Sequence, residues 1–425
     1  MSRVFALVDC NNFYASCEKL FRPDLTNRAV VVLSNNDGCV VARSKEAKAM
    51  GIKMGVPVFQ IRELLEKNNV VAFSSNYALY ADMSARVMRT LEEMAPAVEV
   101  YSIDEAFIDL SGVASAVNLT EFGHQIRQRV QQWVGITVCV GIAPTKTLAK
   151  LANYGAKSWL KTGGVVDLIS KERQRKLMAL LPVNEVWGIG GRLTKRLEEM
   201  GIHTVLDLAD APTKLIRQQF SVVVERTVME LNGESCIELE DIPPTKKEIV
   251  SSRAFGERVT ELAAMHEAIA EYVHRACKKL RRERCQAKRI SVFLRTSPFS
   301  DHQLDPYYSN SRNAELSYPS DDTRDFLHVA SKLLDSIWKE GFRYAKAGVM
   351  LSDFYADGVC QQDLFATSDT VRGNSALMGL MDQINEQMPN SLYFASKGTN
   401  QVWGMKRELL SPAFTTSWNS LPKAR

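Results

Sequence analysis

Apolar positions in the first part of the chain alternate between short continuous runs and helical spacing. The apolar runs at 3–9 and 136–143 have the length of buried strands. Two further runs, at 98–103 and 106–110, are separated only by Asp104-Glu105, which predicts a hairpin. A helix before the hairpin is predicted from apolar residues at a spacing of three to four, closed by Pro96. These residues are Leu79, Met83, Val87, Leu91 and Met94.

With a second helix predicted at about 119–134, the element order is β-α-β-β-α-β. This order is that of the split βαβ, or ferredoxin-like, fold. The first and third strands of that fold lie side by side at the centre of the sheet. We therefore expect Asp9, which ends the first strand, to lie close to Asp104 and Glu105.

The rest of the chain divides into two helical stretches, a linker, a second domain and a tail. Residues 145–157 predict a basic helix, and 184–209 predict helical segments joined by glycine turns. Residues 241–247 contain two prolines and predict a linker. A second α+β domain is expected from 248 to about 354, and a polar, loop-like tail beyond 356. Its predicted strands lie at 248–255, 289–296 and 345–354, and its predicted helices at 262–284 and 323–340.

Length and composition set broad limits on the class of protein. At 425 residues the chain is too long for one core, so two to four domains are expected. It contains no stretch of about 20 apolar residues, as a membrane span requires, and its first residues do not form a signal peptide. The eight cysteines include no CxxC pair, which favours small buried side chains in a reducing cytoplasm over disulfides or zinc.

Charge is distributed unevenly along the chain. Residues 1–110 carry 12 Lys/Arg against 14 Asp/Glu, whereas residues 246–295 carry 13 against 6. This separation suggests polyanion binding in the distal domain and metal or phosphate chemistry in the first. A basic surface patch by itself is common and only suggestive.

The acidic residues Asp9, Asp104 and Glu105 are the candidate catalytic group. An Asp-Glu pair at a hairpin tip is more often an ordinary turn, but a third carboxylate converging on it favours a site for two divalent ions. Paired ions can clamp the attacking and leaving oxygens of a phosphoryl transfer. The backbone carbonyl of Cys10 could add a ligand. The six histidines lie elsewhere in the sequence, which disfavours a His-dependent hydrolase.

Four cations are candidates for binding a triphosphate: Arg43, Lys45, Lys48 and Lys157. The alternative for the first three is an ordinary solvated helix face, and the segment alone does not decide between them. No Walker-type motif is present, so the chain is not a P-loop protein.

The aromatic pair Phe13-Tyr14 follows Asp9 closely. Such pairs are usually core residues. A flat ring below a nucleotide sugar would instead exclude a 2′-hydroxyl. The Gly188-x-Gly190 turn is a candidate helix-hairpin-helix whose backbone N–H groups could bind a DNA phosphate, although glycine turns between helices are common.

Five motifs, in order, resemble the Y-family DNA polymerases, and within them the UmuC/MucB type. They are DCNNFYASCE (9–18), SSNYALYADMS (74–84), YSIDEAFIDL (101–110), VGIAPTKTLAKLAN (140–153) and VWGIGGRL (186–193). A less specific resemblance continues through TSPF (296–299) and YAKAGVMLSDF (344–354).

The resemblance implies roles for single residues. Asp9 and Asp104 match the metal-bridging aspartates, Glu105 completes a site for two Mg²⁺ ions, and Tyr14 matches the sugar-selecting aromatic. Lys157 matches a lysine that contacts the triphosphate. Two positions depart from the family pattern: Lys48 stands where Arg is usual, and Lys45 stands where many relatives carry Tyr.

The resemblance also implies a domain plan: an α+β multidomain chain with a ferredoxin-like palm, small fingers, a helical thumb and an α+β little finger. The expected bounds are palm 1–12 and 76–170, fingers 13–75, thumb 171–240, linker 241–247, little finger 248–355 and tail 356–425. Lys246 and Arg253, in the basic segment, are taken as DNA contacts.

Partners are expected from the same resemblance. They are primer-template DNA, a deoxynucleoside triphosphate (dNTP), the UmuD′-type dimer and RecA, in a bacterial cytoplasm and associated with the nucleoid. No membrane partner is expected. The tail segment QQDLF looks like a peptide that binds the beta sliding clamp, through Gln361, Leu364 and Phe365.

The predicted function is error-prone translesion DNA synthesis in the SOS response to DNA damage. Two alternatives are weighed against it. A class III nucleotide cyclase uses a similar palm but needs neither a helix-hairpin-helix nor a basic distal domain. A non-catalytic adaptor for DNA and clamp would not need all three carboxylates.

Overall fold

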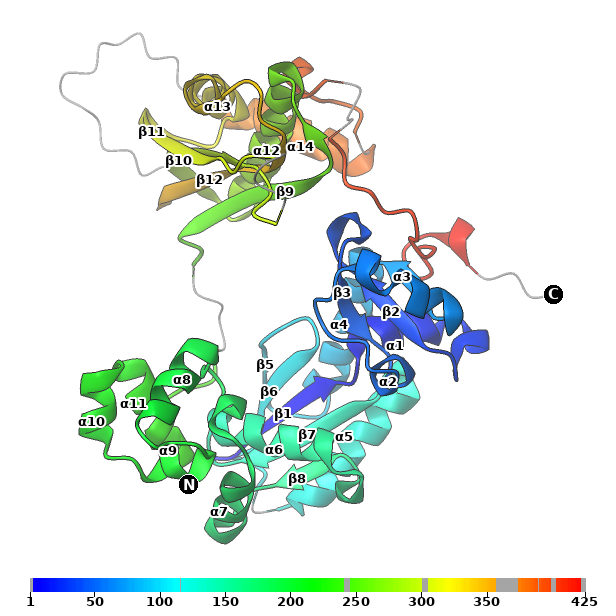
Figure 1. Ribbon diagram of the computed structural model, residues 1–425, viewed down its shortest axis with the longest axis vertical. Coiled ribbons are helices and arrows are strands. Elements are labelled where there is room, and N and C mark those ends of the chain that lie inside the picture. Colours follow the sequence, from blue (N-terminus) through cyan, green and yellow to red (C-terminus); the bar gives the residue numbers. More distant parts are fainter. Residues whose placement is uncertain are drawn as a thin grey trace. The chain divides into compact units, whose positions relative to one another are not determined.

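The computed structural model describes residues 3–114, 116–240, 245–299, 305–356, 374–388, 390–398 and 403–421. The chain forms two compact units (Figure 1). Unit 1 comprises residues 1–243 together with 409–425, and unit 2 comprises residues 244–408. Unit 1 is therefore built from both ends of the chain.

The central sheet of unit 1 has five strands in the order β5-β6-β1-β7-β8. These strands are β1 (Phe5–Cys10), β5 (Ala97–Val100), β6 (Glu105–Asp109), β7 (Val138–Ala143) and β8 (Val165–Asp167). β1 pairs antiparallel with β6 on one side and with β7 on the other. The predicted ferredoxin-like order is confirmed, and β8 extends the sheet parallel to β7.

Successive side chains of β1 enter two different cores, because a strand alternates its faces. Ala6 and Val8 pack with α4 (Tyr77–Glu92) and α5 (Leu119–Val134). Phe5 and Leu7 pack with α6 (Lys146–Ser158). Asp9 has the parity of Phe5 and Leu7 and so belongs to the face that α6 covers.

α6 lies unusually close to the sheet at Gly141. A Cβ atom at this position would lie 2.2 Å from the backbone nitrogen of Asn153 and 2.4 Å from the carbonyl oxygen of Ala149. The Asn153 side chain donates hydrogen bonds to the carbonyl oxygens of Leu7 and Cys139, at 3.2 and 2.9 Å. The backbone contact fixes the distance between α6 and the carboxylate-bearing strands.

The hairpin differs in detail from the prediction. β5 ends at Val100 and β6 begins at Glu105, so the turn comprises residues 101–104 and Glu105 is a strand residue. The hydroxyl of Ser102 holds this turn by accepting hydrogen bonds from the N–H groups of Asp104 and Glu105, at 3.2 and 3.1 Å. Helix α4 ends at Glu92, so Met94 lies just beyond it.

A three-stranded sheet, in the order β3-β2-β4, lies between β1 and α4 in the sequence. Its strands are β2 (Val30–Leu33), β3 (Val40–Arg43) and β4 (Val71–Ser74). The helices of this segment are α1 (Phe13–Leu20), α2 (Lys45–Ala49) and α3 (Val58–Lys67). Valines of β2 are buried on both faces of the sheet.

The helical part of unit 1 follows β8. It consists of α7 (Lys171–Leu180), α8 (Gly191–Glu199), α9 (Val205–Asp210), α10 (Thr213–Gln219) and α11 (Val222–Leu231). Its apolar side chains share a core with α6 and the sheet residues Phe5 and Phe107.

Unit 2 has a four-stranded sheet in the order β11-β10-β12-β9, packed against two helices. The strands are β9 (Glu248–Val259), β10 (Cys285–Arg295), β11 (Ser309–Ser320) and β12 (Tyr344–Ala356), and the helices are α12 (Leu262–Arg282) and α13 (Thr323–Ile337). The predicted α+β domain is confirmed, with β11 as an additional strand.

The tail is more ordered than the loop predicted beyond 356. It contains α14 (Ser375–Gln387), which belongs to unit 2 and whose Met378 is buried. Among the described residues, no helix combines the length and apolar character that crossing a membrane demands.

Candidate active site

Asp9 and Glu105 lie directly opposite each other on the paired strands β1 and β6. Asp9 is only 5% exposed, and its carboxyl group is close enough to that of Glu105 for each to shift the pKa of the other. The backbone N–H of Cys10 donates to the carbonyl oxygen of Asp104 at 2.8 Å, which joins the hairpin turn to the end of β1. The sheet therefore brings together the three residues that the sequence places about a hundred positions apart.

Two lysines of α6 neutralise this acidic pair. Lys157 Nζ lies 2.5 Å from Asp9 Oδ2, and Lys150 Nζ lies 2.9 Å from Glu105 Oε2. The lysines are seven residues apart, two turns of the helix, so both side chains reach the same face of the sheet. Lys150 also lies over the Tyr101 ring, 4.4 Å from its centroid.

The two carboxyl groups have opposite pKa shifts. Burial raises the pKa of Asp9 to about 7, although Lys157 opposes the rise. Burial alone would also raise the pKa of Glu105, but hydrogen bonds from Asp9 and Lys150 hold it below its ordinary value. Without a metal ion, the pair therefore favours one shared proton, as closely spaced carboxyl groups do.

Asp104 completes the donor set from the turn. Its Oδ1 accepts a hydrogen bond of 2.6 Å from the Ser102 hydroxyl. The described residues contain no group of three ligand side chains already arranged around one point. The donors nevertheless fit a hard divalent cation, since they are carboxylate oxygens. Burial is the main cause of the raised pKa of Asp9, and the Glu105 carboxyl group adds to it.

Cations of the β3–α2 segment lie near the same carboxylates. Burial lowers the pKa of Lys48, and the neighbouring charges Arg43 and Lys157 lower it further, while Asp9 opposes them. Arg43 donates to the carbonyl oxygen of Ile52 at 2.7 Å. Lys45 is exposed in the first turn of α2. The structure therefore groups Arg43, Lys48 and Lys157 electrostatically.

The aromatic pair after β1 divides between core and surface. Phe13 is 3% exposed and packs in the hydrophobic core, as the alternative interpretation of the pair expected. Tyr14 is partly exposed, and its ring stacks on that of Tyr80, with centroids 4.3 Å apart and an interplanar angle of 14°. Burial raises the pKa of Tyr14, and the nearby charge of Asp104 adds to this rise. Tyr14 is therefore a partly exposed ring within electrostatic range of Asp104.

The candidate DNA contacts fall in both units. In unit 1, Gly188 has a φ of 86°, which favours glycine, and Gly190 is the N-cap of α8. In unit 2, Lys246 forms an ion pair with Glu283. Arg253 lines a basic groove between β9 and α12. The groove also contains Arg275, Lys278, Lys279 and Arg282. The clamp-peptide residues Gln361, Leu364 and Phe365 lie outside the described residues.

Sequence reasoning missed Lys150 and Glu18. Lys150 could have been found from its spacing of seven residues from Lys157 on one helix. Glu18 is fully buried below Tyr80, and Tyr80 OH donates to Glu18 Oε1 at 2.6 Å. No local pattern distinguishes this glutamate from an exposed helix residue.

Solved structures share this architecture. A Y-family DNA polymerase chimera of Dbh and Dpo4 covers 83% of this chain with a TM-score of 0.68 at 21% sequence identity, and all of that chain is covered. An insertion ternary complex of Dbh DNA polymerase matches the same share of this chain and all of its own, with a TM-score of 0.55 at 20% identity. The fold is that of the Y-family DNA polymerases.

Sequence comparison defines the family more closely. Residues 8–154 match the impB/mucB/samB family, 246–364 match its C-terminal domain and 171–202 match the IMS family HHH motif. Residues 375–424 match a domain of unknown function. The UmuC protein of Salmonella typhimurium is 54% identical over 99% of this chain and 100% of its own length.

A more distant relative is DNA polymerase IV of Pelotomaculum thermopropionicum, 30% identical over 86% of this chain and 89% of its own length. The chain belongs to the impB/mucB/samB family and is a Y-family polymerase of the UmuC/MucB type.

Proposed function

We propose that this chain extends a DNA primer from dNTPs across damaged template, as an error-prone polymerase of the SOS response. The observation that carries the proposal is the pair of buried Asp9 and half-buried Glu105, flanked by Lys150 and Lys157 and close to Lys48. Phosphoryl transfer depends chiefly on positioning and charge neutralisation, and this site supplies both without a histidine.

Asp9, Asp104, Glu105 and the carbonyl oxygen of Cys10 would hold two Mg²⁺ ions. Once bound, the ions would stabilise charge that develops on the transferred phosphoryl group. The chain's own cations have a separate task. Lys157, Lys48 and Arg43 would bind the triphosphate and align its α-phosphate with the primer 3′-hydroxyl. Lys48 would hold phosphate as a point charge, without the two-pronged geometry of arginine. Lys45, which is exposed, would be a further contact of the triphosphate.

Tyr14 would select the sugar. Its ring lies within electrostatic range of Asp104 and is held by stacking on Tyr80. A rigid ring below the sugar leaves no room for a 2′-hydroxyl, so deoxyribose would be favoured. Phe13, buried in the core, would support the backbone of this position without touching the nucleotide.

DNA would be held by contacts that do not read sequence. The N–H groups at the start of α8, next to Gly188 and Gly190, suit a phosphate of the backbone. The basic groove containing Arg253, with Lys246 close by in sequence, suits a second stretch of phosphates.

The partners remain part of the proposal. We propose that the segment at Gln361, Leu364 and Phe365 binds the beta sliding clamp, and that the chain works with a UmuD′-type dimer and RecA in the bacterial cytoplasm, at the nucleoid. Replacing Leu364 and Phe365 together by alanine should abolish retention on immobilised clamp while primer extension without clamp is unchanged. Retained clamp binding would exclude this peptide as the clamp contact.

Primer extension on damaged template tests the central proposal. The wild type should add nucleotides in the presence of Mg²⁺, clamp, RecA filament and UmuD′-type dimer, and Asp104→Ala should not. If neither protein incorporates nucleotide under these conditions, the adaptor alternative holds. Incubation with ATP and Mg²⁺ but no DNA tests the cyclase alternative, which requires a cyclic product.

A further inference from the structure

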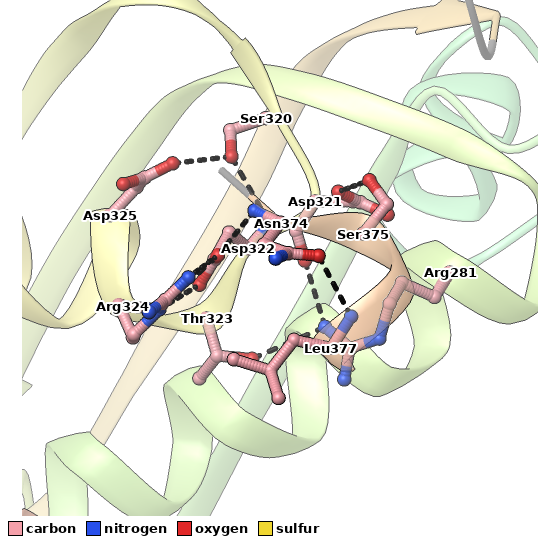
Figure 2. A network of polar contacts seen from close by, with 10 residues as sticks. All are labelled: Arg281, Ser320, Asp321, Asp322, Thr323, Arg324, Asp325, Asn374, Ser375 and Leu377. Carbon is pink, nitrogen blue, oxygen red and sulfur yellow. Dashed lines mark hydrogen bonds and ion pairs between the residues drawn. The ribbon is translucent and has the colours of Figure 1, made fainter. Parts of the chain in front are cut away.

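The C-terminal region that matches a domain of unknown function contacts unit 2 at its start. Figure 2 shows the contacts of Asn374 and Ser375 with Asp322 and Asp321. The N–H of Asn374 donates to Asp322 Oδ2 at 2.9 Å, and Arg281 donates to the carbonyl oxygen of Asp321 at 2.8 Å. Arg281 also binds both carboxylate oxygens of Asp382 in α14, at 2.7 and 3.1 Å.

The end of the same region belongs to unit 1. The N–H of Ser74, at the end of β4, donates to the carbonyl oxygen of Leu409 at 2.9 Å. In return, the Leu409 N–H donates to the Ser74 hydroxyl at 3.0 Å. The Phe414 ring stacks on Phe21 with centroids 4.7 Å apart and is buried in the core shared by β1 and α4. Residues 409–414 are thus part of the packing of unit 1.

Asn76 connects this segment to helix α4. Its Oδ1 caps the helix by accepting a hydrogen bond from the N–H of Leu79 at 3.2 Å. Its Nδ2 donates to the hydroxyl and carbonyl oxygens of Ser411, at 3.0 and 3.2 Å, and to the carbonyl oxygen of Pro412 at 3.3 Å. One buried amide therefore fixes both the start of α4 and the path of the C-terminal segment.

Ser411 continues this chain of contacts toward the nucleotide site. Its hydroxyl donates to Glu18 Oε1 at 3.1 Å, the same oxygen that accepts the hydrogen bond from Tyr80. The Tyr80 ring in turn stacks on Tyr14. Four side chains in succession, Ser411, Glu18, Tyr80 and Tyr14, therefore link the C-terminal segment to the ring within electrostatic range of Asp104.

The central carboxyl group of this chain of contacts, that of Glu18, is shielded from water. Glu18 is fully buried, and its second oxygen, Oε2, has no hydrogen-bond partner in the part of the chain that the structure describes. A buried carboxyl group with one uncompensated oxygen depends strongly on the donors that remain. Loss of the Ser411 hydroxyl would leave Tyr80 as the single side-chain donor, and the Tyr80 ring would have to adjust with the carboxyl group.

We propose that residues 409–414 are a positioning element of the nucleotide pocket. Ser411, acting through Glu18 and Tyr80, fixes the ring of Tyr14 and thereby sharpens the rejection of ribonucleotides. This inference rests on the proposed function, in which Tyr14 lies below the sugar. It gives the last part of the domain of unknown function a specific role in substrate selection.

Full-length variants test the role by the ratio of kcat/KM for a dNTP to that for the matching ribonucleotide. Ser411→Ala should lower the ratio about tenfold, the factor that one hydrogen bond of ordinary net strength supports. Ser411→Thr keeps the hydroxyl and should restore the ratio. Tyr80→Phe keeps the stacked ring but loses the contact with Glu18, so it should resemble Ser411→Ala. Ser417→Ala, three residues beyond this segment, is the matched control and should not change the ratio.

A second measurement does not depend on activity. Hydrogen exchange of the backbone amides of α1 and of the first turns of α4 should become faster in Ser411→Ala and stay unchanged in Ser417→Ala. The selectivity ratio and hydrogen exchange together separate this inference from the proposed function. Tyr14→Ala serves as the reference for complete loss of sugar selection.

Selectivity lost in Tyr14→Ala but kept in Ser411→Ala would overturn the positioning role and leave the polymerase proposal intact. Unchanged selectivity in Tyr14→Ala would also overturn the positioning role of Ser411, because that role acts through Tyr14. If the wild type does not incorporate nucleotides, the proposed function fails, and hydrogen exchange alone then decides whether Ser411 positions α1 and α4. Unchanged exchange in Ser411→Ala overturns the inference in every case.

Discussion

Asp9 and Glu105 are direct partners across the antiparallel strands β1 and β6, and their carboxyl groups are close enough to shift each other's pKa. Both are largely withdrawn from water, and each has a lysine of α6 as its nearest cation. Burial raises the pKa of Asp9 to about 7, so a bound cation would favour its charged form. The acidic pair lies where phosphoryl transfer needs negative charge to hold cations.

Asp9→Asn should abolish catalysis without unfolding the chain. The amide preserves the shape of the side chain but removes one charge from the metal site. Metal ions supply several kcal/mol of transition-state stabilisation, so kcat for nucleotide addition should fall on the order of 10³-fold or more. Single-turnover primer extension measures the loss. The control Asp24→Asn removes an exposed aspartate paired with Arg22 and should retain full activity.

Lys157→Gln should weaken nucleotide binding more than it slows chemistry. If Lys157 holds the triphosphate equally in the ground state and the transition state, its loss raises KM while kcat changes little. We expect KM for the dNTP to rise about tenfold, as for the loss of one charge-assisted hydrogen bond. Steady-state kinetics with Lys161→Gln as the control checks this. A fall in kcat at unchanged KM would contradict the assignment.

DNA affinity should fall steeply as salt increases. Counterion release gives a log–log slope of roughly −0.9 for each duplex phosphate contacted. Lys278→Ala, in the basic groove of unit 2, should make the slope shallower by about one, whereas Lys332→Ala on α13 should not. Fluorescence anisotropy across a salt series measures both slopes. Equal slopes in all three proteins would exclude the groove as a phosphate contact.

Glu18→Gln should change how stability depends on pH. Burial raises the pKa of Glu18 above its ordinary value of 4.5, although the hydrogen bonds from Tyr80 and Ser411 oppose the rise. The wild type therefore has the full contribution of this residue below pH 4.5 and loses it as pH rises through the raised pKa.

Because the glutamine cannot ionise, the free energy of unfolding of Glu18→Gln, relative to wild type, should increase from pH 4.5 to pH 8. Urea titrations at a series of pH values measure the difference. Glu63→Gln, on the exposed face of α3, reports the effect of removing a surface charge. A difference that falls with rising pH would mean that the Glu18 carboxylate is stabilised by folding.

The palm could be predicted because its elements carry strong local signals. The helix at 119–134 was predicted with the same bounds as α5, and the strand order follows from the element order. The position of Glu105 was harder, because a turn held by the Ser102 hydroxyl shifts the start of β6 by one residue relative to the prediction.

Two of the elements that were not predicted, β11 and α14, escaped for different reasons. β11 contains mostly polar residues, and only Ala314, Leu316 and Tyr318 alternate toward the core, which is a weak strand signal. In α14 the apolar residues do follow helical spacing, at Leu377, Met378, Met381 and Ile384. Their signal was obscured by the polar composition of the surrounding tail.

The candidate carboxylates could be predicted because the palm topology forces them together. The support of Tyr14 could not, since Glu18 and Ser411 are separated by 393 positions. Contacts of such separation leave no periodicity in the sequence, and only tertiary packing reveals them.

Unit 1 begins with the first strand of the chain and is completed by residues 409–414. Domains fold largely in the order of their synthesis, yet here Ser411 and Phe414 of unit 1 are synthesised after the whole of unit 2. A nascent or prematurely terminated chain therefore lacks part of the packing below Tyr14 even when its palm is already folded. A chain that ends before residue 411 would therefore differ from one that includes it in how strictly it rejects ribonucleotides.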